Sequence, residues 1–136
     1  KLLNQEWKVY LDSESAGQYT ISRASWIGDY VDPNSFLDLF LCNGGNNRTG
    51  WCNAEYDRLI LDVAPKMKSH EERLAVFQEA ETLLLDAMPM IPIYIYTSKH
   101  LMNSSVKNHN GNLLDQTTFK ELTLESDSSD STGGNH

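Results

Sequence analysis

The chain has 136 residues, enough for one ordinary domain, and its 40% hydrophobic content allows a real core. Its formal net charge of -8 argues against binding to nucleic acid or to anionic membrane surfaces, and its 11 basic residues form no stripe. No apolar run approaches the roughly 18 residues of a membrane span. The longest run, near Met88–Tyr96, is interrupted by two prolines.

The sequence begins at Lys1 and opens directly on a helix-like segment, KLLNQEWKVYL. We expect the chain to be part of a longer protein, so the absence of a signal peptide says nothing about export. Helical spacing within residues 1–12 predicts a first helix. Its apolar face would be formed by Leu3, Trp7, Tyr10 and Leu11. Asp12–Gly17 is polar, ends in glycine and predicts a turn.

Tyr19–Trp26 alternates β-branched and aromatic residues, which predicts a strand that breaks at Gly28. Asp32 is a suitable N-cap and Pro33 a suitable first helical residue, so a short buried helix is predicted through Phe36–Leu41. A strand end, a polar loop and a helix start form the place where α/β proteins bind ligands. This loop is therefore the first candidate for a functional site.

Two cysteines, Cys42 and Cys52, flank the Gly/Asn-rich segment NGGNNRTGW. A disulfide that closes this loop would stabilise the fold by about 3 kcal/mol or less. Two unrelated free thiols are the alternative, but an even count around one loop favours a disulfide and an oxidising compartment. No pair of His or Cys residues has the spacing of zinc ligands, so no metal is expected.

Two further helices are predicted after this loop. Asn53 can cap the first of them, and Pro65 ends it. Its buried stripe would be Tyr56, Leu59, Ile60 and Val63. Ser69 and Glu72 form a capping box at the start of the second, which runs to about Asp86. Its apolar face would be Leu74, Phe77, Ala80 and Leu84.

The remaining sequence predicts strands and loops rather than helices. Met90–Met102 is dense in β-branched and aromatic residues and predicts a strand buried on both faces at its start. Asn103–Asp115 is loop-like, and Phe119–Leu124 can form a last short strand. Ser126–His136 has no apolar residue and is expected to be disordered.

Three side chains in and before the Gly28 loop carry functional chemistry. Asp29 can bind a cation such as a ligand amino group, or it can cap backbone amides. Arg23 needs an anionic partner, either a ligand carboxylate or an internal acid. Strand alternation would place Arg23 and Trp26 on opposite faces. Both can line one site only if the chain twists or bulges before Gly28, or if they reach the site from different sides.

No catalytic pattern is visible. The sequence lacks GxSxG, HExxH and phosphate-loop motifs, and its histidines are scattered. Asp29 and Asp32 are three residues apart around a helix start, which is ordinary capping, so we expect no enzyme and no cofactor. Trp7, Trp26 and Tyr96 are residues of the kind that more often belong to a core.

Several blocks nevertheless share one resemblance. The run RASWIGDYVDPNSFLDLFL, the NN pair, the AEYDRLI helix and IPIYIYTSKHLM occur in that order. Together they resemble the C-terminal quarter of the periplasmic oligopeptide-binding proteins, the extracytoplasmic receptors of peptide-importing ABC transporters. The resemblance covers roughly residues 1–125 and excludes the tail from Ser126.

The resemblance implies a role for each candidate residue. Asp29 would hold the α-amino group of a bound peptide, and Arg23 the carboxyl end of shorter peptides. The walls and rim of the side-chain pockets would be formed by Trp26, Trp7, Tyr96 and Asn46. Ile27 stands where some family members have a cysteine, and the Cys42–Cys52 pair resembles the loop disulfide of the dipeptide-binding branch. The branch, and with it the peptide length, stays open.

The family fold is α/β with two lobes that close on the ligand, and this chain would be its C-terminal fragment, with mixed strands and about four helices. Residues 1–97 would end the second lobe, residues 98–125 would return across the hinge to the first, and residues 126–136 would be a tail. The implied partners are a peptide, the membrane permease of an ABC transporter and the missing N-terminal part of the protein. One alternative is that the same fold binds a dipeptide, a murein peptide or another ligand. The other is that the chain is an interaction domain without a ligand.

Overall fold

A computed structural model of the protein describes residues 2–112 and 114–125, so the expected tail at residues 126–136 lies outside the described residues. The chain divides into two compact units, Lys1–Ile93 and Tyr94–His136. Each is considered by itself. The described residues contain four α-helices, as expected, and one short pair of strands. None of the described helices is long and apolar enough to cross a membrane.

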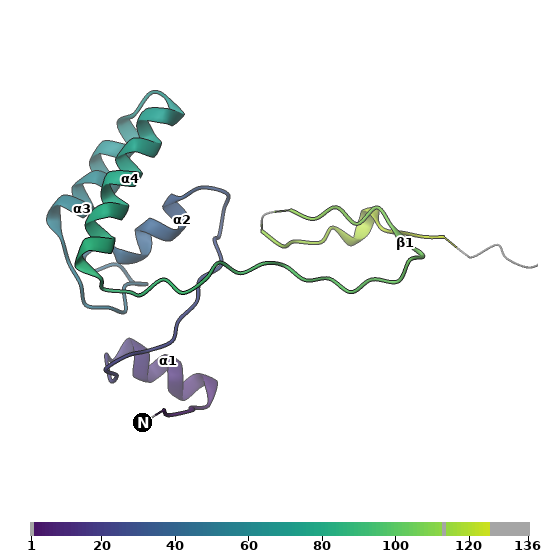
Figure 1. Ribbon diagram of the computed structural model, residues 1–136, viewed down its shortest axis with the longest axis horizontal. Helices are drawn as coiled ribbons and strands as arrows, with labels where there is room; N and C mark the ends of the chain where they lie inside the picture. The colour runs from purple at the N-terminus through teal and green to yellow at the C-terminus, as the bar shows by residue number, and fades with distance from the viewer. Residues whose placement is uncertain (1, 113, 126–136) are drawn as a thin grey trace, which may run out of the picture. The chain divides into compact units, whose positions relative to one another are not determined.

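The first unit is helical (Figure 1). After α1 (Trp7–Ser15) come α2 (Asn34–Leu37) and the 3-10 turn η1 (Asp38–Phe40). The next helical stretch is continuous and consists of α3 (Ala54–Arg58), the π-helical turn η2 (Leu59–Val63) and the 3-10 turn η3 (Ala64–Lys66). It leads into α4 (His70–Ala87), the longest helix. Figure 1 shows α3 and α4 lying side by side, with α2 next to them.

Side chains from α2, from the α3–η3 stretch and from α4 form the hydrophobic core. The core residues are Leu37, Tyr56, Leu59, Ile60, Ala64, Phe77, Ala80 and Leu84. The predicted stripes of both helices therefore face the core, except that Leu74 is exposed and Val63 lies only partly buried beside it. Burial of one large apolar side chain stabilises a fold by roughly 1.5–3 kcal/mol. Short helices are marginally stable alone, so this packing stabilises them in the fold.

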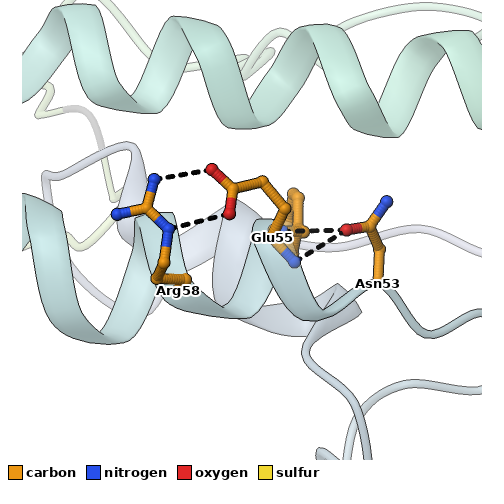
Figure 2. A network of polar contacts seen from close by, with 4 residues as sticks. Asn53, Glu55 and Arg58 are labelled. Atoms are coloured by element: carbon orange, nitrogen blue, oxygen red, sulfur yellow. Dashed lines mark hydrogen bonds and ion pairs between the residues drawn. The ribbon is translucent and has the colours of Figure 1, made fainter.

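The predicted caps of α3 and α4 are confirmed. The Asn53 side chain accepts hydrogen bonds from the backbone amides of Glu55 and Tyr56, at 2.9 and 3.1 Å, and Glu55 pairs in turn with Arg58 (Figure 2). Ser69 and Glu72 form the complete capping box. Met88 ends α4 in the left-handed region at a φ of 50°.

The predicted disulfide between Cys42 and Cys52 is also confirmed. The loop that it closes is ordered further by Asn47, whose side-chain amide donates to the carbonyls of Phe40, Leu41 and Trp51 at 2.9–3.2 Å. Polar contacts to backbone carbonyls thus add to the packing of Leu41 and Trp51 against the core.

The first helix begins later than predicted. Residues 2–5 are not helical, because Glu6 caps the helix by accepting hydrogen bonds from the amides of Lys8 and Val9. The helix continues to Ser15, so the turn is shorter than predicted and centres on Gly17, whose φ of 65° suits glycine. Leu3 precedes the helix and is exposed, which makes its predicted place on the apolar face wrong.

The two long predicted strands are wrong for the described residues. Neither Tyr19–Trp26 nor Met90–Met102 has strand pairing, and the apolar side chains at the start of the second are exposed rather than buried. High β-propensity favours an extended backbone, but a strand also needs a neighbouring strand to bond with. No such neighbour pairs with either segment in the part of the chain that the structure describes.

The second unit contains the one strand pair among the described residues. β1 (Val106–Lys107) and β2 (Thr123–Leu124) are antiparallel, with Val106 opposite Leu124. The 3-10 turn η4 (Phe119–Glu121) precedes β2, so only the last part of the predicted Phe119–Leu124 strand is a strand.

Candidate functional site

Ser35 organises the loop that leads into α2. Its hydroxyl accepts a hydrogen bond from the backbone amide of Asp29 at 2.7 Å, and its carbonyl accepts one from the Trp26 indole at 2.8 Å. Ser35 itself is only 2% exposed. Two predicted site residues are therefore anchored to one buried residue.

Gly28 lets this loop lie directly against α2. A Cβ added at Gly28 would lie 3.0 Å from a ring carbon of Phe36 and 3.4 Å from the Ser35 hydroxyl. Any side chain would force Phe36 to move. The glycine thus allows the backbone to lie close to Phe36 and Ser35, and it does not end a strand.

Asp29 is exposed, and its carboxylate has no hydrogen-bond or ion-pair partner among the described residues. Burial raises the pKa of the nearby Asp38 carboxyl; a hydrogen bond from Tyr30 opposes this shift and the charge of Asp29 adds to it. The negative charge of Asp29 is therefore not neutralised by any cation among the described residues. Such a carboxylate can bind an ammonium group through a charge-assisted hydrogen bond.

Asp32 has a structural role. Its carboxylate accepts from the Asn34 amide at 2.9 Å and forms a bidentate pair with Arg73 of α4, at 2.5 and 2.9 Å. The Arg73 guanidinium lowers the pKa of Asp32, mainly through this hydrogen bond. α2 begins one residue later than predicted, since Pro33 occupies the N-cap instead of the first helical position.

The segment around Arg23 is tethered to α1. The Tyr10 hydroxyl lies 2.8 Å from a Glu14 carboxylate oxygen and 3.0 Å from the Arg23 carbonyl oxygen. Burial is the main cause that raises the pKa of Tyr10. Trp7 packs on the same tyrosine, with ring centroids 5.4 Å apart, but remains 69% exposed. Because residues 19–26 form no strand, the expected placement of Arg23 and Trp26 on opposite strand faces does not hold.

The last two predicted site residues lie elsewhere. Asn46 is exposed within the disulfide loop, next to Asn47, which holds the loop together. Tyr96 belongs to the second unit, where its ring lies 4.9 Å from that of Tyr94. The described residues contain no group of three or more side chains suited to hold a metal ion.

Sequence reasoning missed Ser35. One signal was available. A partly buried indole N–H needs an acceptor, and Ser35 is a polar residue directly before the apolar run FLDLFL, where a buried helix is predicted. The pairing of Asp32 with Arg73, which are 41 residues apart, had no local signal.

Comparison with known proteins gives relatives over most of the chain. No family model matches. The dipeptide-binding protein DppE of Bacillus subtilis is 42% identical over 107 residues, which cover 79% of this chain and 20% of that protein. The periplasmic oligopeptide-binding protein OppA of Escherichia coli is 32% identical over 125 residues, 91% of this chain and 23% of that protein.

Solved structures agree with these relatives. The murein tripeptide-binding protein MppA of Escherichia coli matches with a TM-score of 0.81 and 34% identity, and Haemophilus influenzae OppA in complex with RPPGFSPFR matches with a TM-score of 0.80 and 34% identity. Each match covers 91% of this chain and 24% of the solved one. The chain spans about a fifth of the length of the curated relatives it matches. The chain is therefore homologous to one segment of the oligopeptide- and dipeptide-binding proteins.

Proposed function

We propose that the chain is part of an extracytoplasmic receptor that binds oligopeptides for an ABC importer, a binding role without enzymatic chemistry. The observation that carries this proposal is the exposed carboxylate of Asp29, which pairs with none of the described residues and lies in a loop anchored on Ser35. Similarity to a relative solved with a bound peptide over 91% of the chain supports it. Several of the relatives are named as periplasmic, which supports a periplasmic location.

The proposed binding scheme uses the groups that every peptide shares. Asp29 binds the amino end and Arg23 the carboxyl end, while the peptide side chains occupy pockets. The pocket walls and rim are formed by Trp26, Trp7, Tyr96 and Asn46. The exposure of these aromatic side chains supports this role, since aromatic surfaces accept many kinds of side chain.

In this proposal the chain supplies one side of a cleft between two lobes. Residues 1–97 end one lobe and residues 98–125 return toward the other; a unit boundary between Ile93 and Tyr94 lies close to this division. The other partners are the remainder of the receptor and a membrane permease. Burial by the second lobe strengthens an ion pair that would be weak at an open surface.

A shorter or modified peptide is the second candidate ligand. Two relatives favour it, since one is named as a dipeptide-binding protein and one as a murein peptide-binding protein. Mass spectrometry of ligands that co-purify with a full-length receptor carrying this segment separates these candidates. The same scheme at Asp29 holds for both.

The test uses a full-length receptor that carries this segment, for example Escherichia coli OppA with the matching segment exchanged for this chain. By calorimetry, Asp29→Ala should weaken binding of a tripeptide with a free amino end by about 2–5 kcal/mol, because a buried ammonium loses its partner. An N-acetylated tripeptide should bind weakly to the unmodified receptor and be insensitive to the substitution.

Asp62→Ala is the matched control, since Asp62 is an exposed aspartate of η2 and its loss changes the net charge equally. It should leave tripeptide affinity unchanged. Equal affinity for free and acetylated peptides in the unmodified receptor would refute the role of Asp29. The 136-residue chain alone should bind the tripeptide weakly or not at all, and micromolar affinity would contradict the one-sided cleft.

A further inference from the structure

Apart from Tyr56 with its hydroxyl, Ser35 is the one buried residue with a polar side chain among the described residues, and it holds both Trp26 and Asp29. The two hydrogen bonds use different parts of the residue. The Trp26 indole donates to the Ser35 carbonyl, whereas the Asp29 amide donates to the Ser35 hydroxyl. Only the second bond depends on the identity of the side chain.

Ser35 is itself held firmly. Its amide donates to the Asp32 carbonyl at 3.1 Å, and Asp32 is clamped to α4 through Arg73. Two residues further on, the Leu37 carbonyl accepts a hydrogen bond of 2.6 Å from the fully buried Tyr56 hydroxyl. The hydroxyl that receives the Asp29 amide is therefore fixed to the core from both sides.

The Asp29 side chain has no such support, because its carboxylate has no hydrogen-bond or ion-pair partner among the described residues. Its position is determined by its backbone, and the backbone is held through the amide. A charged group binds most tightly when it is held in place before the ligand arrives, since no ordering free energy is then lost on binding.

We infer that Ser35 is a positioning residue for the amino end of the ligand: its hydroxyl fixes the Asp29 backbone so that the carboxylate is preorganised for a primary ammonium group. This inference rests on the proposed function of Asp29. Ser35 acts through Asp29 and does not contact the ligand.

The test is a double-mutant cycle in the full-length receptor that carries this segment. Ser35→Ala should raise the Kd of a free-amine tripeptide by about five- to tenfold, the equivalent of one hydrogen bond, and should leave the Kd of the N-acetylated tripeptide unchanged. In an Asp29→Ala background Ser35→Ala should have no further effect. Ser35→Thr, which keeps the hydroxyl, should retain most of the affinity. Equal losses for both peptides, or additive effects with Asp29→Ala, would overturn the inference.

A second measurement separates this inference from the role of Asp29. Amide hydrogen exchange by NMR on the 136-residue chain should show faster exchange at the Asp29 amide in Ser35→Ala, with the Trp26 indole N–H unchanged as an internal control. If Asp29→Ala leaves peptide binding unaltered, faster exchange still supports the anchor on the Asp29 backbone, and the proposed function of Asp29 fails together with the positioning role that rests on it. Should Ser35→Ala fail to fold, the unmodified chain decides: a protected Asp29 amide supports the anchor, and an unprotected one overturns it.

Discussion

The helical body at residues 34–87 and the segment at residues 91–103 are both rich in large apolar residues. The two regions differ in how far these side chains are buried. The first buries them, as Phe77 at 3% exposure illustrates. The second leaves them in water, as Ile95 at 93% exposure illustrates. A helix satisfies its backbone within itself and needs only a surface to pack on, whereas an extended segment needs a neighbouring strand. The helical body therefore holds together within this chain, and the extended segment has a surface that is open to a partner.

A matched pair of alanine substitutions, one in each region, tests this difference in burial most strongly. Phe77→Ala should lower the free energy of unfolding by about 3–5 kcal/mol, because it leaves a cavity in the core. Ile95→Ala should change it by less than about 0.5 kcal/mol. Urea denaturation of the 136-residue chain, followed by circular dichroism, measures both. Similar losses for the two variants would mean that Ile95 is packed as well, and the comparison would fail.

A smaller effect is expected at the single hydrogen bond that joins α2 to the core. Tyr56→Phe keeps the ring but leaves the buried Leu37 carbonyl without its donor, which should cost about 1–3 kcal/mol. Burial raises the pKa of Tyr56, ahead of the charges of Asp38 and Asp57, so the contribution of the hydroxyl to stability is complete below the usual tyrosine pKa. It declines above that pKa, because the unfolded chain ionises there while the buried hydroxyl stays protonated. The difference between the two proteins should shrink above about pH 10. A difference that is independent of pH would contradict this account of the hydroxyl.

The smallest expected effect concerns the ion pair that ties the candidate loop to α4. Asp32→Asn keeps an oxygen for the Asn34 amide but removes the charge that faces Arg73, and should cost about 1 kcal/mol or less at pH 7, since both side chains are partly exposed. The pKa of Asp32 is lowered in the folded state, so the pair stabilises above the usual aspartate pKa and this contribution disappears as the pH falls through the folded value.

Urea midpoints of the two proteins at several pH values check this. The gap between them should narrow below about pH 4. Lys120 lies in the second unit and is exposed, so Lys120→Gln serves as a charge-removal control with no expected change. A constant gap down to pH 2 would show that the charge of Asp32 does not contribute.

Local chemistry explains which features were predictable. The caps at Asn53 and Ser69, the helices that they begin and the disulfide loop follow from residues within about ten positions of one another, and all are confirmed. The strands at Tyr19–Trp26 and Met90–Met102 were predicted from the same kind of local pattern and are wrong here. Strand pairing depends on a partner that no local pattern contains.

The candidate site divides in the same way. The amino-acid sequence alone identified Asp29, Trp26 and the helix start that follows them, because a carboxylate, an indole and a glycine in a short loop are visible as residue types. Only the tertiary structure shows that Asp32 forms an ion pair with Arg73, while Asp29 has no partner among the described residues. It also shows that Ser35 anchors the loop. The reason is distance along the chain: Asp32 and Arg73 are 41 residues apart, and their contact exists only once α2 has packed on α4.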